Sequence, residues 1–431
     1  MYDFSQLAAQ FLSGLSYAST LFLVASGLSL IFGVTRIINF AHGSFYMIGA
    51  YLACTLTAAF PATPIGHWSG VVIAAITVGF LGILMEVFIL RRIYRAPEVF
   101  QILATFGVIL IAENCVQLIW GSDEILAARA PGLRSTVDIL GQSFPQYDLA
   151  LIATGPLVLG VIWLLVHRTY WGILVRAATE DRQMAASLGI NQSLVFTSVV
   201  FLGCALAGLA GALEIPKETA NLQMDLNIIT EAFVVVVVGG LGSMPGAFLA
   251  ALLIGLTHAF GILLMPSFTL LMMFVLMAIV LVVRPLGFLG RERRAPRIAA
   301  LVAQPLRVAD PRFHVAAMAA FVLLLVAPCL VNQYGQIILT EIFILALFAA
   351  SLHLIMSFGG LVSFGHAAFF GAGAYAAALV GAQLGLPLFA AVIASMVAAA
   401  VSACVIGWFC TRLSGVYLAF LTLAFAQILW S

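Results

Sequence analysis

Two histidines, His42 and His366, are the clearest candidates for chemistry, because each lies two residues after a phenylalanine and just before small residues. No carboxylate or third ligand accompanies either histidine, so a zinc site is not expected. The polar neighbours in the two stretches are Asn39, Ser44 and Ser363. Such stretches can begin a helix, with Asn39 or Ser363 as the cap, and expose backbone groups. Two interpretations stay open: the histidines form interhelical hydrogen bonds that hold the fold, or they line a passage.

Glu113 is a further candidate, since it lies in the middle of an apolar segment with Asn114 and Gln117 nearby. An ionisable side chain surrounded by lipid costs several kcal/mol, so such residues usually face other helices or water. We therefore expect Glu113 to face the interior of a helix bundle or an aqueous cavity. A role in transport and a purely structural role are both compatible with this position.

A polar stretch at 176–190 is the best candidate for contact with another protein. Its residues favour a helix with acidic side chains near its start and Gly189 as its C-cap. The residues of interest are Glu180, Asp181, Ala185, Ala186, Leu188 and Gly189. Small apolar side chains beside charges are suited to docking in a groove of a cytoplasmic partner. A helix lying on the lipid headgroups fits the same pattern.

Nothing in the sequence indicates an enzyme. The only lysine is Lys217, so no G-x-x-x-x-G-K-[ST] phosphate loop exists, and any ATPase must be another polypeptide. A glycine-rich stretch misses the dinucleotide-binding pattern and instead predicts a helix break or close backbone packing. Its residues are Gly239, Gly240, Gly242, Pro245 and Gly246. We expect no catalytic residues, no metal and no cofactor.

The elements that position these residues must be membrane helices. Of 431 residues, 64% are hydrophobic and only 8% are charged, whereas soluble domains carry about 25% charged residues. This composition excludes a soluble enzyme and a nucleic-acid binder. We count about 14 apolar segments, many near the ~20 residues that cross a bilayer. They predict an all-α polytopic membrane protein with broken or re-entrant helices.

The basic residues indicate the orientation of the chain. With the amino terminus outside, the inner loops hold all 18 Lys and Arg residues except Arg129, Arg134 and Lys217. Cytoplasmic loops of membrane proteins are enriched in basic residues. We therefore expect the amino terminus outside and the Arg-rich segment 285–312 in the cytoplasm.

The chain contains an internal repeat. Residues 25–53 align without gaps to residues 349–377, and the alignment matches His42 with His366. Other matched pairs are Phe40 with Phe364, Tyr51 with Tyr375 and, further on, Phe100 with Phe420. Both copies run in the same direction through the predicted membrane, so we expect a parallel repeat about an axis along the membrane normal. A passage for a small solute between the two copies is the natural functional reading.

The repeat divides the chain into three parts: a first unit at 1–284, a basic cytoplasmic linker at 285–312 and a second unit at 313–431. The second unit is much shorter than the first, and the chain ends at Ser431 inside an apolar run. We therefore expect the second unit to be incomplete and the chain to be a fragment of a longer protein.

These motifs together resemble the membrane permeases of branched-chain amino acid ABC transporters. Residues 1–294 are similar to the H-type permease subunit, and residues from about 313 onward are similar to the start of the M-type subunit. The stretches that carry the resemblance are 38–43, 180–190, 239–246 and 360–370. The resemblance covers almost the whole chain and implies a natural fusion of two permeases that are normally separate.

The resemblance also implies partners: cytoplasmic ABC ATPase subunits and a periplasmic solute-binding protein, with the permease in the bacterial inner membrane. Glu180 to Gly189 would be the coupling helix that contacts the ATPase, with Met184 where many ABC permeases have the first Glu of their E-A-A signature. The solute would be a branched-chain amino acid, with urea or short amides as further options. The alternative is an ATP-independent channel or secondary carrier that uses Glu113 or the paired histidines.

Overall fold

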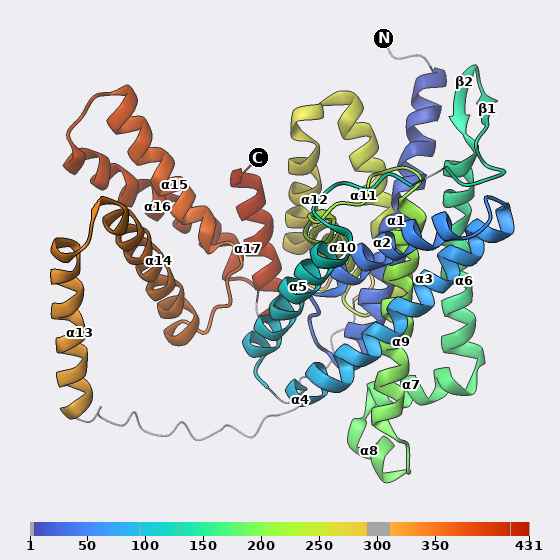
Figure 1. Cartoon of the computed structure of the whole chain (residues 1–431), viewed down its shortest axis with the longest axis horizontal. Helices are drawn as coiled ribbons and strands as arrows, with labels where there is room; N and C mark the ends of the chain where they lie inside the picture. The colour runs from blue at the N-terminus through green and yellow to red at the C-terminus, as the bar shows by residue number, and fades with distance from the viewer. Residues whose placement is uncertain (1–3, 95, 128, 291–310, 414, 431) are drawn as a thin grey trace.

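The fold is built almost entirely of helices, with one small β-hairpin (Figure 1). We describe it from a computed structural model, which covers residues 4–94, 96–127, 129–290, 311–413 and 415–430. Most of the predicted basic linker therefore lies outside the described residues. An all-α polytopic membrane protein is thereby confirmed, whereas the hairpin was not predicted.

Over its described residues, the first unit contains twelve α-helices and the hairpin. In chain order its helices are α1 (Phe4–Thr35), α2 (His42–Ala59), α3 (Pro64–Met85), α4 (Arg91–Ile93), α5 (Glu98–Trp120), α6 (Gln146–Arg168), α7 (Tyr170–Glu180), α8 (Arg182–Ser187), α9 (Gln192–Glu214), α10 (Met224–Gly239), α11 (Met244–Leu264) and α12 (Thr269–Val283). A π-helical turn, Glu86–Leu90, joins α3 to α4, and a 3-10 turn, Pro266–Phe268, precedes α12. Strands β1 (Thr136–Ile139) and β2 (Gln142–Pro145) pair antiparallel, with Thr136 opposite Pro145.

The second unit repeats the beginning of the first. After α13 (Pro311–Leu330), it contains α14 (Gln333–Phe358), α15 (His366–Ala378), a π-helical turn (Leu379–Gln383), α16 (Leu388–Cys410) and α17 (Gly415–Trp430). By their order, α14, α15, α16 and α17 correspond to α1, α2, α3 and α5. Figure 1 shows α1 and α14 running in the same direction, as a parallel repeat requires. The second unit meets the first chiefly where α17 packs against α12 and α10.

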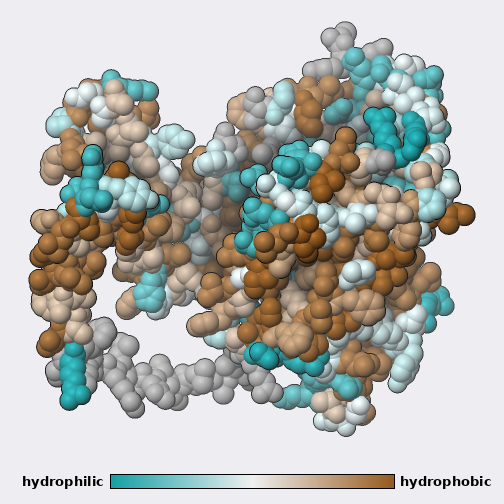
Figure 2. All heavy atoms as spheres, viewed as in Figure 1, coloured by the Kyte–Doolittle hydropathy of each residue, from teal (hydrophilic) through white to brown (hydrophobic). Residues whose placement is uncertain are grey.

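Among the described residues, eight helices are long and apolar enough to cross a membrane, and three further apolar helices are shorter. The expected count of about 14 is not confirmed, because several apolar segments form helices too short to cross alone. The segment around 229–241, for example, forms the 16-residue α10. Figure 2 shows apolar side chains across the middle of the molecule and polar ones towards its upper and lower edges.

Helix α1 is the centre of the first unit, where it packs against α6, α9, α10 and α11. Small residues make this close packing possible, as is usual between membrane helices. A Cβ atom added to Gly27 would lie 2.4 Å from the carbonyl oxygen of Gly203 on α9. Larger residues at this crossing would force α1 and α9 apart.

The two ends of the bundle differ in structure (Figure 1). Helices α7 and α8 project from one end, which we call the loop side. The β-hairpin and the start of α1 lie at the other end, which we call the hairpin side. The sequence-based orientation assigns the loop side to the cytoplasm, because α7 and α8 carry Arg176 and Arg182.

Candidate functional site

The chain turns back into the bundle after α1. We call residues 36–41 the strap, because they lead from the end of α1 to the start of α2. The strap begins at Arg36, which has a φ of +61°. At its far end, the Nε2 atom of His42 lies 3.1 Å from the carbonyl oxygen of Val24. Val24 precedes the end of α1 by three turns, roughly 16 Å, so α2 begins deep inside the bundle, as expected for a broken or re-entrant helix.

The two histidines occupy equivalent places in the two units. The repeat aligns Gly27 with Ser351. A Cβ atom on Gly27 would meet the His42 ring at 3.0 Å, and the Nε2 atom of His366 forms a 2.8 Å hydrogen bond with the Ser351 hydroxyl. Each histidine, in the first turn of its helix, therefore packs against the preceding helix at the position that the repeat matches, Gly27 in α1 or Ser351 in α14. These contacts support the interpretation that the histidines hold the fold together.

Asn39 and Ser363 do not cap the helices, so that prediction was wrong. The N-cap residues of α2 and α15 are Ala41 and Gly365, and neither helix has a side-chain cap. Asn39 lies two residues before the N-cap, and its side chain accepts no hydrogen bond from the first turn. Its side chain is fully buried, and neither its amide nitrogen nor its oxygen has a hydrogen-bond partner. The Ser363 hydroxyl is also without a partner.

Five phenylalanines meet where the two units contact each other. We call them the axial phenylalanines: Phe40, Phe106, Phe233, Phe364 and Phe420. Phe40 lies 5.0 Å from Phe106, 4.6 Å from Phe233 and 5.5 Å from Phe364, measured between ring centroids. Phe233 also lies 4.8 Å from Phe420. This cluster was not predicted, although two of its members, Phe40 and Phe364, are matched by the repeat.

Asp225, in the first turn of α10, is a second residue that the sequence analysis missed. It is 2% exposed, and its carboxylate accepts hydrogen bonds from the Ser44 hydroxyl (3.0 Å) and the Leu226 amide (2.7 Å). Glu113, which is partly buried on α5, lies close enough to interact with Asp225 electrostatically. Of the predicted path residues, only Ser44 is shown in direct contact with this carboxylate. The sole sequence signal of Asp225 is its place before an apolar run.

The predicted single helix at 176–190 is broken into α7 and α8. Asp181 ends α7 and caps α8, accepting a 3.0 Å hydrogen bond from the Met184 amide. Gly189 follows α8 with a φ of +81°, as predicted for a C-cap glycine. Leu188 and Ala186 are exposed, and so is Met184. Ala185, in contrast, is buried in the chain's own core, so its expected role in docking is corrected.

Arg182 fixes α8 to the centre of the bundle. Its guanidinium group donates 2.9 Å hydrogen bonds to the carbonyl oxygens of Val34 and Thr35, at the end of α1, and lies over the Phe196 ring. Burial lowers the pKa of Arg182, and so does the nearby charge of Arg36. The guanidinium group stays protonated because arginine is effectively always charged in proteins. Arg182 thus connects α8 to the residues that lead into the strap.

The glycine-rich stretch forms the predicted helix break. Helix α10 ends at Gly239 and α11 begins at Met244, with Gly240 and Gly242 at φ values of +99° and +79° between them. Pro245 is in the first turn of α11, and Gly246 packs tightly on Gly239, since a Cβ atom on Gly246 would lie 2.0 Å from the Gly239 carbonyl oxygen.

This break lies beside the predicted partner-binding stretch. A cavity of about 510 Å³ is lined by Glu180 and Arg176 from α7, by Gly242 and Pro245 from the break, and by Val34 from α1. Two motifs separated by about sixty residues in the sequence therefore form one region at the loop side.

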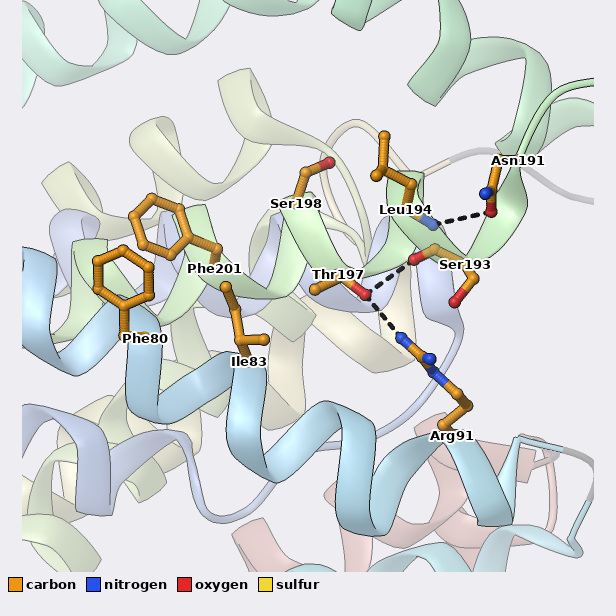
Figure 3. Close-up of a pocket in the computed structure, with 9 residues that line it drawn as sticks. All are labelled: Phe80, Ile83, Arg91, Asn191, Ser193, Leu194, Thr197, Ser198 and Phe201. Carbon is orange, nitrogen blue, oxygen red and sulfur yellow. Dashed lines mark hydrogen bonds between the residues drawn. The ribbon is translucent and has the colours of Figure 1, made fainter.

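A buried carboxylate holds α3 to α9 near the loop side. Glu86 is fully buried and accepts hydrogen bonds from Arg91 (2.9 Å), Thr197 (2.8 Å) and Tyr94 (2.9 Å). Figure 3 shows Arg91 reaching Thr197 beside a surface groove of about 480 Å³, whose apolar end is formed by Phe80 and other apolar side chains. The ion pair accounts for Glu86 within an apolar segment.

A second charged network lies near the hairpin side. The Nζ atom of Lys217 is 3.4 Å from Asp148 and 3.6 Å from Glu214. Burial lowers the pKa of Lys217, but the negative charges of Glu214 and Asp148 outweigh this effect and raise the pKa above its ordinary value. Ser16 on α1 donates a 3.0 Å hydrogen bond to Asp148, so the network ties α1, α6 and α9 together. Within the described residues, no group of three His, Cys, Asp or Glu side chains is placed to hold a metal ion.

The chain matches the family described as branched-chain amino acid transport system / permease component, over residues 10–283 and 336–431. The permease protein BraD of Pseudomonas aeruginosa is 29% identical over 293 residues, 65% of this chain and 95% of BraD. LivH of Escherichia coli is 29% identical over 67% of this chain and 97% of LivH. Both are named high-affinity branched-chain amino acid transport system permease proteins.

LivM of Escherichia coli, a permease protein of the same kind of system, is 27% identical over 63% of this chain and 68% of LivM. That alignment is longer than the whole second unit, so it includes residues of the first unit. No solved structure matches the chain. Because the family match covers most of the residues, including both copies of the Phe-x-His motif, the chain belongs to the family of branched-chain amino acid transport permease components.

Proposed function

We propose that this chain is the permease component of an ABC importer for branched-chain amino acids or similar small solutes, with urea and short amides as further options. A separate cytoplasmic ATPase would supply the energy, and a periplasmic binding protein would deliver the solute. The observation that carries the proposal is the structure of α8. It presents Met184 at the loop side, with Leu188 exposed directly after its last residue, while Arg182 anchors it to the end of α1.

The division into units supports the same proposal. We propose a first permease unit at 1–284, a basic cytoplasmic linker at 285–312 and a second unit at 313–431. The family match in two separate segments supports this division, and so does the recurrence of α1, α2, α3 and α5 as α14 to α17. The route for the solute would lie between the units, along the axis that relates them.

The orientation is proposed from charge. In a bacterial inner membrane, the loop side would face the cytoplasm and the hairpin side the periplasm, because basic residues concentrate in cytoplasmic loops. The ATPase would then contact α8, and the binding protein would contact the hairpin side.

The test is uptake of labelled L-leucine and labelled urea by cells that carry the full gene with its neighbouring genes. We expect leucine uptake that requires an intact ATPase gene and binding-protein gene. Uptake that persists after deletion of the ATPase gene would favour an ATP-independent carrier instead. Uptake of urea without leucine would place the chain among the permeases for amides.

A further inference from the structure

We propose that the N-terminus of α2, with Asn39, Asp225 and Glu113, forms a transient binding site for a zwitterionic α-amino acid inside the membrane. This inference rests on the proposed function and adds to it a place in the permease where the solute itself is recognised. The site would lie next to the axial phenylalanines.

The first step of the argument is the helix terminus. Helix α2 begins deep in the bundle without a side-chain cap, so the amides of Gly43 and Ser44 in its first turn have no intrahelical acceptor. The N-terminus of a helix carries a partial positive charge and favours anions. Broken helices inside membrane transporters use such ends to hold a substrate carboxylate.

The second step is Asn39. Its amide group is fully buried, and both its nitrogen and its oxygen lack hydrogen-bond partners. Buried polar groups are nearly always paired, so an unpaired amide needs an explanation. Asn39 is held at the start of α2, because its backbone carbonyl accepts a 3.3 Å hydrogen bond from the His42 amide. A carboxylate bound at the α2 terminus would provide an acceptor for the amide nitrogen of Asn39.

The third step is the pair of carboxylates. Asp225 contacts the first turn of α2 through Ser44, and a Cβ atom added to Gly43 would lie 2.2 Å from the Asp225 carbonyl oxygen. Each oxygen of the Asp225 carboxylate can accept two hydrogen bonds. One oxygen accepts a hydrogen bond from Ser44 and the other from Leu226, so each can accept one more. Asp225 therefore offers an acceptor for an ammonium group beside the first turn of α2, and Glu113 adds negative charge to which Asp225 responds electrostatically.

The fourth step is the apolar wall. Phe106 and Glu113 lie on α5, and Phe233 and Asp225 lie on α10, in each case about two turns apart along the helix. Because Phe40 contacts both Phe106 and Phe233, the three rings form one apolar surface about two helical turns from Asp225 and Glu113 along α10 and α5. An amino acid held at its charged groups would place a branched apolar side chain against these rings.

The experiment uses the purified full chain in lipid nanodiscs, without partners, and measures apparent affinities by saturation-transfer NMR. The probes are L-leucine, isocaproate, which lacks the ammonium group, and isoamylamine, which lacks the carboxylate. Asn39→Asp should weaken leucine and isocaproate about tenfold or more, but not isoamylamine. Asp225→Asn should weaken leucine and isoamylamine by a similar factor, but not isocaproate.

Two matched substitutions outside the site serve as controls. Asn332→Asp at the start of α14 and Asp138→Asn in the hairpin should leave all three affinities unchanged. The proposal is overturned if the wild type does not bind leucine although cells import it, or if both site variants weaken all three probes equally. Absence of leucine uptake by the wild-type system would instead remove the proposed function.

Discussion

Phe40 and Phe364 occupy the same position in the two copies of the repeat, and their rings meet edge to face with centroids 5.5 Å apart. A residue can contact its own repeat equivalent only close to the axis that relates the copies. An axis that relates the two copies as a parallel repeat would therefore pass between these two rings. Any route along the axis is closed at this point by the axial phenylalanines.

Removal of one of these rings should make the protein leak. We expect Phe40→Ala to allow labelled leucine to leave preloaded proteoliposomes without ATP, because a gap replaces the ring at the axis. Such a substitution of a buried Phe costs about 3–5 kcal/mol of stability, so the amount of folded protein must be compared first. Phe80→Ala is the matched control, since the Phe80 side chain is 57% exposed and lies outside the axial phenylalanines. If Phe40→Ala and Phe364→Ala are both as tight as the wild type, the axial cluster is not a barrier.

The exposed face of α8 should be required for coupling. Met184 and Leu188 are 59% and 73% exposed, so Met184→Ser and Leu188→Ser should change the stability of the chain by less than about 0.5 kcal/mol. We expect the double variant to lose leucine uptake in cells, because the apolar contact with an ATPase is removed. Leu140→Ser, in the hairpin turn on the opposite side, should have no effect. Normal uptake by the double variant would exclude α8 as the docking surface.

Arg182 should transmit force rather than bind the ATPase. Arg182→Gln removes the guanidinium group that holds the carbonyl oxygens of Val34 and Thr35, while Met184 and Leu188 stay in place. We expect ATP hydrolysis by the assembled transporter to persist and leucine uptake per ATP hydrolysed to fall several-fold. Arg182→Lys should recover part of the ratio, because an ammonium group can reach one carbonyl oxygen. A proportional loss of hydrolysis and uptake would indicate a docking role instead.

Features that recur in the repeat, or that depend only on neighbouring residues, could be predicted from the sequence. His42 and His366 were found because they recur in one pattern, and Gly240 and Gly242 because a helix cannot continue through them. Asn39 was misassigned as a cap because the start of α2 is fixed by contacts of His42 with α1, which no local pattern reveals. Arg182 looked like one of several charges in a polar loop. Its structural role depends on hydrogen bonds to the carbonyl oxygens of Val34 and Thr35, almost 150 residues earlier in the chain. The cluster of axial phenylalanines could not be predicted either, because it forms only where the two units pack against each other.

The Lys217 network should make stability depend on pH in the alkaline range. The pKa of Lys217 is higher in the folded protein than its ordinary value of 10.5. Its contribution is therefore complete below about pH 10.5 and is lost as the pH rises through the folded pKa. We expect the thermal unfolding temperature in nanodiscs to fall above pH 10.5, and to fall less in Lys217→Arg, which stays charged.

A second variant isolates the ion pairs. Lys217→Met leaves the carboxylates of Asp148 and Glu214 without a cation, which should cost about 2 kcal/mol or more at pH 7. An unchanged unfolding temperature for Lys217→Met would show that the carboxylates are stabilised by other groups.

The two sides of the bundle should be accessible from opposite sides of the membrane. Ser143 in β2 and Gln183 in α8 are both exposed and lie at the hairpin side and the loop side. In a variant without the native cysteines, we expect Ser143→Cys to react with an impermeant maleimide on cells whose outer membrane is permeable. Gln183→Cys should react only after the inner membrane is opened, because the proposed orientation, based on the basic loops, places its side in the cytoplasm. The reverse pattern would invert the proposed orientation and place α8 where no cytoplasmic ATPase can reach it.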